Sequence, residues 1–167
     1  MNERVSGLVL AVHPTSRGFG WVVFEAKDDP VAWGIASART GRDEKVLNRF
    51  CRLLKKYEPG AFILEDYEAH AARRSERIRA LCREMQHLAA LSRCRLAVLD
   101  RDLIRAQFAR EGAKTRYEIA SAIAERIGAF AHRLPRYRKP WLPEDSRQSL
   151  FDAAALAMTY LELRAHA

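Results

Sequence analysis

Three polar side chains stand beside apolar runs of the sequence, where they could form a chemical site. His13 follows the apolar run at residues 8–12, at the point where a buried strand would emerge. Glu65 follows the apolar run at 62–64, with Asp66 and Glu68 close behind, and carboxylates at the carboxyl end of a buried parallel strand lie where α/β sheets place their ligands. The alternative for these acids is that one is functional while the others are solvated. Asp152 belongs to an alanine-rich helical face, where a carboxylate is costly without a partner or a metal. If the three converge, they form a site; the alternative for His13 is that it simply ends a strand.

The hydrophobic pattern along the chain predicts the elements that position these side chains. Residues 7–25 indicate two strands and a turn, because Pro14 and Gly18 carry turn chemistry between two apolar runs. A helix then separates a three-stranded antiparallel meander from the next strand, which must therefore run parallel to a neighbour through a crossover. In chain order we expect strands at 8–12, 19–24 and 31–39, a helix at 43–57, a strand at 62–64, the longest helix at 71–92, a strand at 95–99, helices at 100–110 and 117–128, an irregular segment at 132–143 and a helix at 145–165.

The composition fits one globular domain of 167 residues, of which 49% are hydrophobic. A formal net charge of +8 indicates a polyanionic partner, most often nucleic acid. We expect no membrane association, because no helix joins a basic face to a broad apolar one and no apolar stretch could span a bilayer. No signal peptide is evident either. The cysteines at 51, 82 and 94 are odd in number and widely spaced, which indicates reduced thiols in a cytoplasmic protein.

Two basic segments are candidates for contacts with nucleic acid. Arginines crowd the start of the helix at 71–92, where the helix dipole disfavours them, so a phosphate-facing role competes with a solvated face. Between residues 111 and 141, basic and aromatic side chains alternate in a partly irregular segment, which suits backbone contact and base stacking. With the turn residue Arg17, the expected nucleic-acid-binding residues are Arg17, Arg73, Arg74, Arg77, Lys114, Arg136, Arg138, Lys139 and Trp141.

Three motifs and the order of the elements resemble one known family. The hairpin VLAVHPTSRGFGWVVFE is similar to a first strand and turn of the form G-I-D-P-G-[ST]-R-x-x-G. AFILEDY resembles an acidic second motif strand, and SLFDAAALA resembles the start of a C-terminal helix of the form D-x-x-D-A-x-A. These three patterns are those of the RuvC-like Holliday junction resolvases of the RNase H-like superfamily, which the chain resembles. The resemblance implies one RNase H-like α/β domain over residues 1–167, with three antiparallel and two parallel strands flanked by helices.

The resemblance also assigns roles to single residues. Glu65 and Asp152 match acidic metal ligands, while His13 stands where the family has an aspartate. Ser149 stands in place of a further acid, for which Asp145 or Glu144 could substitute. Lys114 or Lys139 would be the family's phosphate-facing lysine. The expected catalytic set is His13, Glu65, Asp145 and Asp152, and the expected metal ligands are His13, Glu65 and Asp152.

The family hydrolyses phosphodiesters with two divalent cations, and His13 bears on the choice of ion. Mg²⁺ prefers anionic oxygen ligands, whereas His13 offers one neutral nitrogen and cannot bridge two ions. The cofactor is therefore expected to be Mg²⁺ or Mn²⁺, with Mn²⁺ favoured. The leading hypothesis is a metal-dependent endonuclease that acts on branched or structured DNA. Its expected partners are DNA and, in a homodimer, a second copy of the chain. The alternative is a catalytically inactive module that only binds nucleic acid. A metabolite kinase or ATPase fragment is a third hypothesis, although nothing supplies a second phosphate-binding lobe.

Overall fold

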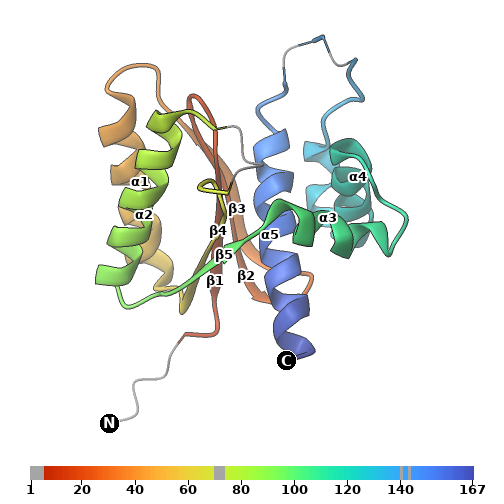
Figure 1. Ribbon diagram of the computed structural model, residues 1–167, viewed down its shortest axis with the longest axis horizontal. Helices are drawn as coiled ribbons and strands as arrows, with labels where there is room; N and C mark the ends of the chain where they lie inside the picture. The colour runs from red at the N-terminus through yellow and green to blue at the C-terminus, as the bar shows by residue number, and fades with distance from the viewer. Residues whose placement is uncertain (1–5, 70–73, 140, 143) are drawn as a thin grey trace.

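Five strands form one mixed sheet at the centre of the molecule (Figure 1). The computed structural model describes residues 6–69, 74–139, 141–142 and 144–167. The sheet order is β3-β2-β1-β4-β5, in which β1 pairs antiparallel with β2 and parallel with β4. This confirms the predicted fold class of three antiparallel and two parallel strands. The strands are β1 (Val9–Pro14), β2 (Gly18–Ala26), β3 (Asp29–Ser37), β4 (Ala61–Glu65) and β5 (Arg95–Leu99).

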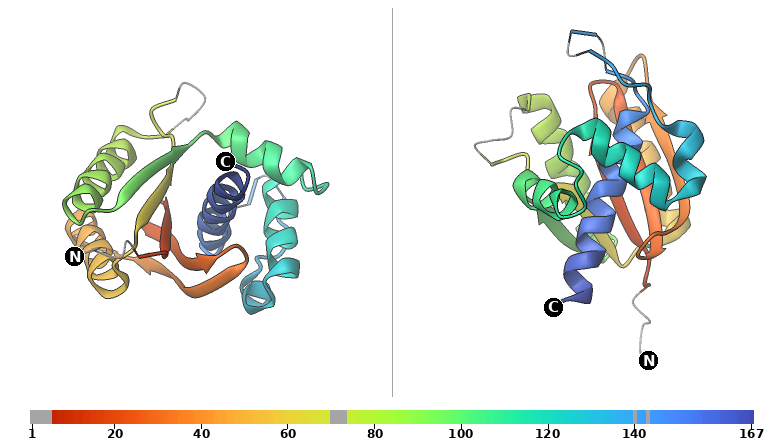
Figure 2. Two further views of the ribbon diagram at one scale, coloured as in Figure 1. Left: turned by 90° about the horizontal axis from the view of Figure 1, so that it is seen from below. Right: turned by 90° about the vertical axis from the view of Figure 1, so that its right-hand side faces the viewer.

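Helices cover both faces of the sheet (Figure 2). On one face lie α1 (Arg42–Tyr57) and α2 (Glu76–Leu91). On the other lies α5 (Gln148–Ala165), with α3 (Arg101–Ala109), α4 (Arg116–Arg126) and the 3-10 helix η1 (Gly128–Arg133) beyond it. In the part of the chain that the structure describes, no helix is long and apolar enough to cross a bilayer. The three cysteines are free thiols, and Cys82 and Cys94 are buried.

The alternation of side chains along β1 and β4 decides which face receives the candidate site. Leu10 and Phe62 pack in the core under α1 and α2, whereas Ala11 and Ile63 pack in the core with α5. Successive side chains of a strand point to opposite faces. His13, two residues after Ala11, and Glu65, two residues after Ile63, therefore point to the face that α5 covers.

Small residues let α5 approach the sheet closely. Its alanines at 153, 154, 155 and 157 are buried, and the helix packs against β1 and β2. On β2, a Cβ atom at Gly20 would overlap the backbone carbonyl of Ser149, so only glycine admits the start of α5 at this distance. The helix consequently presents Asp152, one turn further along, to the ends of β1 and β4.

Helix ends differ from the sequence-based expectations for local reasons. The helix expected at 71–92 begins at Glu76, because the Ser75 hydroxyl caps it by accepting the Ile78 N–H at 3.3 Å. The helix expected from 145 begins at Gln148. The Asp145 carboxylate accepts the Arg147 backbone N–H at 2.9 Å and forms a turn before the helix. The prediction that the segment at 71–92 is the longest helix is therefore wrong, since α2 has 16 residues and α5 has 18.

Two further segments differ in their bounds. The third strand starts at Asp29 rather than at 31, because the tight turn at Asp28, with φ of 60°, lets pairing with β2 begin at once. The start of the segment expected to be irregular, residues 132 and 133, belongs instead to η1, which packs Phe130 into the core. The expected start of the second helix at 71–73 lies outside the described residues.

Candidate functional site

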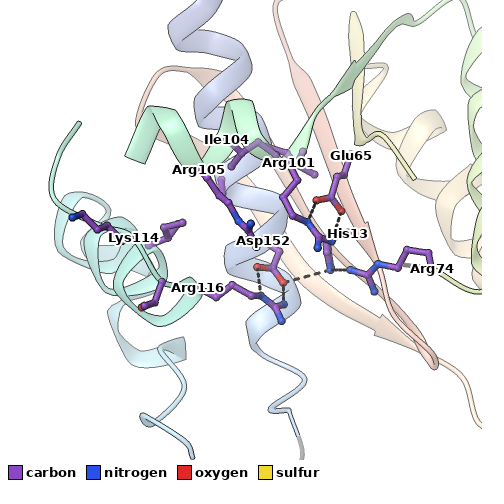
Figure 3. A pocket seen from close by; sticks show the side chains of 13 residues that line it. His13, Glu65, Arg74, Arg101, Ile104, Arg105, Lys114, Arg116 and Asp152 are labelled. Carbon is purple, nitrogen blue, oxygen red and sulfur yellow. Dashed lines mark hydrogen bonds and ion pairs between the residues drawn. The ribbon is translucent and has the colours of Figure 1, made fainter. Parts of the chain in front are cut away.

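The ends of the two central strands bring His13 and Glu65 side by side. β1 and β4 run parallel, with Ala11 opposite Ile63, so the two polar residues are at matching positions near the carboxyl ends of their strands. Both are buried, at 7% and 6% exposure. Asp152 approaches from α5, and its Oδ2 atom lies 3.4 Å from His13 Nε2 (Figure 3). The structure thus brings three of the four predicted catalytic residues to one place.

These three residues line a cavity of about 430 Å³ that is rich in arginine. Its lining contains five cationic side chains against two carboxylates, a net charge of +3 with His13 neutral. The cations are Arg74, Arg101, Arg105, Lys114 and Arg116. Figure 3 shows Arg101 and Arg116 reaching the two carboxylates from different sides and Arg74 reaching His13, whereas Lys114 lies at the rim of the cavity. We call this cavity the arginine pocket.

The Glu65 carboxylate is held by Arg101. Arg101 is the first residue of α3, which begins just after β5 ends beside β4. Its Nε donates to Glu65 Oε1 at 2.7 Å and its Nη2 to Oε2 at 3.3 Å. Such a two-pronged pairing is the strongest geometry available to an arginine and a carboxylate. The hydrogen bond raises the pKa of Arg101 above its ordinary value.

The Asp152 carboxylate is held by Arg116, the first residue of α4. Thr115 and Glu118 form a capping box that fixes where this helix starts. The Arg116 guanidinium forms an ion pair with Asp152 Oδ2, and its Nε lies 3.4 Å from Oδ1. Gln148 donates a further hydrogen bond to Oδ1 at 3.2 Å. The oxygen atoms of buried Glu65 and half-buried Asp152 therefore all face donors from the protein itself.

His13 is a neutral imidazole held between an arginine and a tyrosine. Arg74 Nη2 lies 3.2 Å from His13 Nε2, and the Tyr67 hydroxyl lies 3.3 Å from Nδ1. Because arginine can only donate, we assign Nε2 as the acceptor and place the proton on Nδ1. Burial lowers the pKa of His13 below its ordinary 6.5, although Asp152 acts to raise it. The approach of His13 to Asp152 is consequently not an ion pair at neutral pH.

This lowered pKa predicts a loss of stability in acid. The unfolded chain takes up a proton on His13 near pH 6.5, whereas the folded protein resists it, so the free energy of unfolding falls as the pH drops below 6.5. The loss is about 1.4 kcal/mol per pH unit until the folded pKa is reached. His13→Gln should flatten the pH dependence of urea unfolding below pH 6.5, and exposed His87→Gln should leave it unchanged. Equal slopes for wild type and His13→Gln would contradict the assignment.

The residues present do not fit a divalent cation in this arrangement. Glu65 and Asp152 are already paired with guanidinium groups, and His13 Nε2 faces Arg74. A cation would have to displace these groups and enter a pocket with a net charge of +3. Among the described residues, no three histidine, cysteine, aspartate or glutamate side chains are grouped so that they could hold a metal ion. The predicted metal ligation by His13, Glu65 and Asp152 stays a prediction.

A second pocket of about 300 Å³ adjoins the first and shares Thr115 and Arg116 with it. Its lining includes Arg136, Arg138, Tyr117 and Tyr137, of which the two tyrosines meet edge to face with centroids 5.3 Å apart. The basic and aromatic segment predicted to contact nucleic acid therefore lies next to the arginine pocket. Beyond it, Trp141 is 74% exposed and Lys139 Nζ lies 5.3 Å from the centre of its ring.

Other predicted site residues lie elsewhere. Asp145 lines the second pocket and accepts hydrogen bonds from the Arg147 guanidinium on both oxygens, so the structure does not bring it to His13. Its alternative, Glu144, contacts Arg116 at 2.5 Å. Arg77 is paired with Asp43 at 2.7 Å on the opposite side of the sheet from α5. Arg17 is exposed in the turn between β1 and β2, and Arg73 lies outside the described residues.

Sequence reasoning missed four residues of the site. Arg101 comes two residues after the end of the strand at 95–99, and the rule that polar residues beyond a buried parallel strand face the ligand site could have found it. Arg116 directly follows the capping threonine of a Thr-x-x-Glu pattern, which locates it at the helix start but does not reveal its partner. Tyr67 and Arg105 carry no signal that separates them from ordinary core and surface residues.

Comparison with known proteins identifies the class of fold. No protein-family model and no curated protein sequence matches the chain. Among solved structures, Thermus thermophilus RuvC superposes with a TM-score of 0.69 at 14% identity, covering 95% of this chain and 96% of that one. The yeast mitochondrial Holliday junction resolvase Ydc2 gives 0.62 at 13% identity, covering 94% and 78%. The fowlpox virus Holliday junction resolvase gives 0.57 at 15% identity, covering 94% and 99%. At such identities the likeness shows the fold alone, which is that of the Holliday junction resolvases.

Proposed function

We propose that this chain binds branched or otherwise structured DNA at the arginine pocket and the pocket beside it. The observation that carries this proposal is the charge of the arginine pocket, whose lining has a net charge of +3 at the end of the central strands. A basic cavity of this kind suits a phosphate backbone. The solved structures of the same fold include T. thermophilus RuvC in complex with a Holliday junction substrate.

The second pocket adds a surface for bases. Tyr117 and Tyr137 offer aromatic faces and edges beside Arg136 and Arg138. Bases stack on aromatic side chains only where they are unpaired or unstacked, as at a branch or in a single strand. This combination favours branched or structured DNA over a regular duplex.

The salt dependence of binding tests the proposal. Arg136→Ala, Arg138→Ala and Lys139→Ala together should lower the slope of log affinity against log salt by about three, because each lost phosphate contact removes about one unit. The measurement is fluorescence anisotropy with a four-way junction and with a linear duplex of equal length.

A matched control for this triple variant lies on α1. Arg49, Arg52 and Lys55 are exposed there, and α1 covers the opposite face of the sheet from α5. Replacing all three by alanine should change the slope little. An unchanged slope in the 136, 138 and 139 variant would remove that segment from the interface, and equal affinity for junction and duplex would contradict the preference for branched DNA.

Metal-dependent endonuclease activity with Mg²⁺ or Mn²⁺ is the second candidate. The convergence of His13, Glu65 and Asp152 on one cavity favours it, while the pairing of both acids with arginines weighs against it. Junction cleavage that is present in wild type and absent in Glu65→Gln would establish it. Location in the cytoplasm, organisation as a single domain and dimerisation stay predictions, and light scattering with and without junction DNA would measure the last.

A further inference from the structure

We propose that the arginine pocket binds a phosphate group of DNA without a divalent cation. The guanidinium groups of Arg101 and Arg116 contact Glu65 and Asp152, where a metal ion would otherwise bind. This inference rests on the proposed function, because it names how the DNA is held. It starts from the contacts of the two carboxylates that line the pocket. Arg101 uses two nitrogens on Glu65, and Arg116 contacts both oxygens of Asp152.

These two ion pairs offset the negative charge of the acids. Even with Glu144 counted as a second partner of Arg116, the five cations of the pocket outnumber three carboxylates. Arg116 also contacts Glu144 at 2.5 Å, on the side of the second pocket. The remaining charge of the arginine pocket is therefore positive. Adding a divalent cation would increase that charge, whereas adding a phosphate diester would reduce it.

The remaining positive charge belongs to Arg74, Arg105 and Lys114. Arg74 contacts the neutral His13 and lies over the Tyr67 ring at 5.2 Å, so no carboxylate of the described chain is its partner. Arg105 forms no ion pair or hydrogen bond with any described residue and lines the pocket from α3. The backbone N–H of Lys114, rather than its ammonium group, accounts for its hydrogen bond to Glu118.

The geometry of guanidinium groups favours phosphate binding, in addition to the positive charge of the pocket. A guanidinium presents donors in a planar fork that matches two oxygens of a phosphate. Arg74, Arg101 and Arg105 reach the cavity from α3 and from the residue before Ser75, on different sides of it (Figure 3). The cavity of about 430 Å³ is large enough for a phosphate and part of a sugar. The geometry therefore provides charge, donors and room without an ion.

The test uses variants of the two exposed cations that form no ion pair in the described chain. Arg105→Ala and Lys114→Ala leave the Arg101–Glu65 and Arg116–Asp152 pairs intact, so each protein should keep its melting temperature. Binding of a four-way junction is measured by anisotropy in EDTA and again in Mg²⁺. Arg52→Ala and Lys55→Ala on α1 are the matched controls. We expect wild-type affinity to agree within about twofold between EDTA and Mg²⁺ after correction for ionic strength, and each pocket variant to lose about one unit of salt slope.

Three outcomes would overturn the inference. Binding that disappears in EDTA and returns with Mg²⁺ would show that an ion is needed, while the proposed DNA binding would stand. Binding that is independent of metal but equally strong in Arg105→Ala, Lys114→Ala and the α1 controls would place the phosphate elsewhere. No junction binding in either buffer would end the proposed function and this inference together.

Discussion

Arg101→Met is expected to lower the free energy of unfolding by about 2–3 kcal/mol, because it leaves the Glu65 carboxylate buried without its cation. The Glu65 side chain is only 7% exposed, whereas that of Arg101 is 36% exposed. The loss should therefore be smaller than the ~3–5 kcal/mol typical of breaking a fully buried pair. Urea unfolding at neutral pH measures it.

A double-mutant cycle provides the control for this prediction. Glu65→Gln combined with Arg101→Met removes both charges, and the double variant should recover part of the stability that Arg101→Met loses. Glu65→Gln alone leaves Arg101 with access to solvent, so its cost should be smaller than that of Arg101→Met. If Arg101→Met unfolds at the same urea concentration as wild type, Arg101 does not stabilise Glu65 and the charge argument for the pocket loses its first step.

The sequence predicts the sheet well because burial imposes its pattern locally. Residues 8–12 and 62–64 are apolar runs because both faces of their strands are covered, by α1 and α2 on one side and by α5 on the other. The polar residue that ends each run then marks the site, so His13 and Glu65 could be found without a structure. The helix starts could not, since they depend on the side chains of Ser75 and Asp145 bonding to particular backbone groups.

The arginine partners were beyond sequence reasoning for a different reason. Arg101 is 36 residues from Glu65, and Arg116 is 36 residues from Asp152, so no local spacing records either pair. A surface arginine and one that turns into a cavity have the same local signature. The arginines at the start of the second helix, for which a phosphate-facing role stays a prediction, have different surroundings in the structure. Arg74 lines the pocket, whereas Arg77 and Arg83 are paired with carboxylates.

The positive charge of the pocket depends on one neutral residue, His13, and on two acids that are paired with arginines, Glu65 and Asp152. His13 stands where the first motif of the RuvC-like resolvases, which the hairpin resembles, has an aspartate. As a neutral side chain it contributes no negative charge. A carboxylate at this position would face Arg74, whose Nη2 is 3.2 Å from His13 Nε2. His13→Asp alone should therefore create a third ion pair rather than a metal site, and it should leave the response of the protein to Mg²⁺ close to that of wild type.

Combining His13→Asp with Arg101→Ala and Arg116→Ala is expected to produce a Mg²⁺ response that wild type lacks. The variant keeps three cations in the pocket lining and has three carboxylates, so the net charge falls from +3 to zero. Without metal, repulsion among the carboxylates should lower its melting temperature. Mg²⁺ at about 100 times its dissociation constant should restore about 2.7 kcal/mol, since it binds only the folded state. Melting curves across a Mg²⁺ series measure this, with Arg52→Ala combined with Lys55→Ala as the control for lost positive charge. A wild-type melting temperature that rises with Mg²⁺ as steeply as that of the triple variant would show that the guanidinium groups do not exclude the cation.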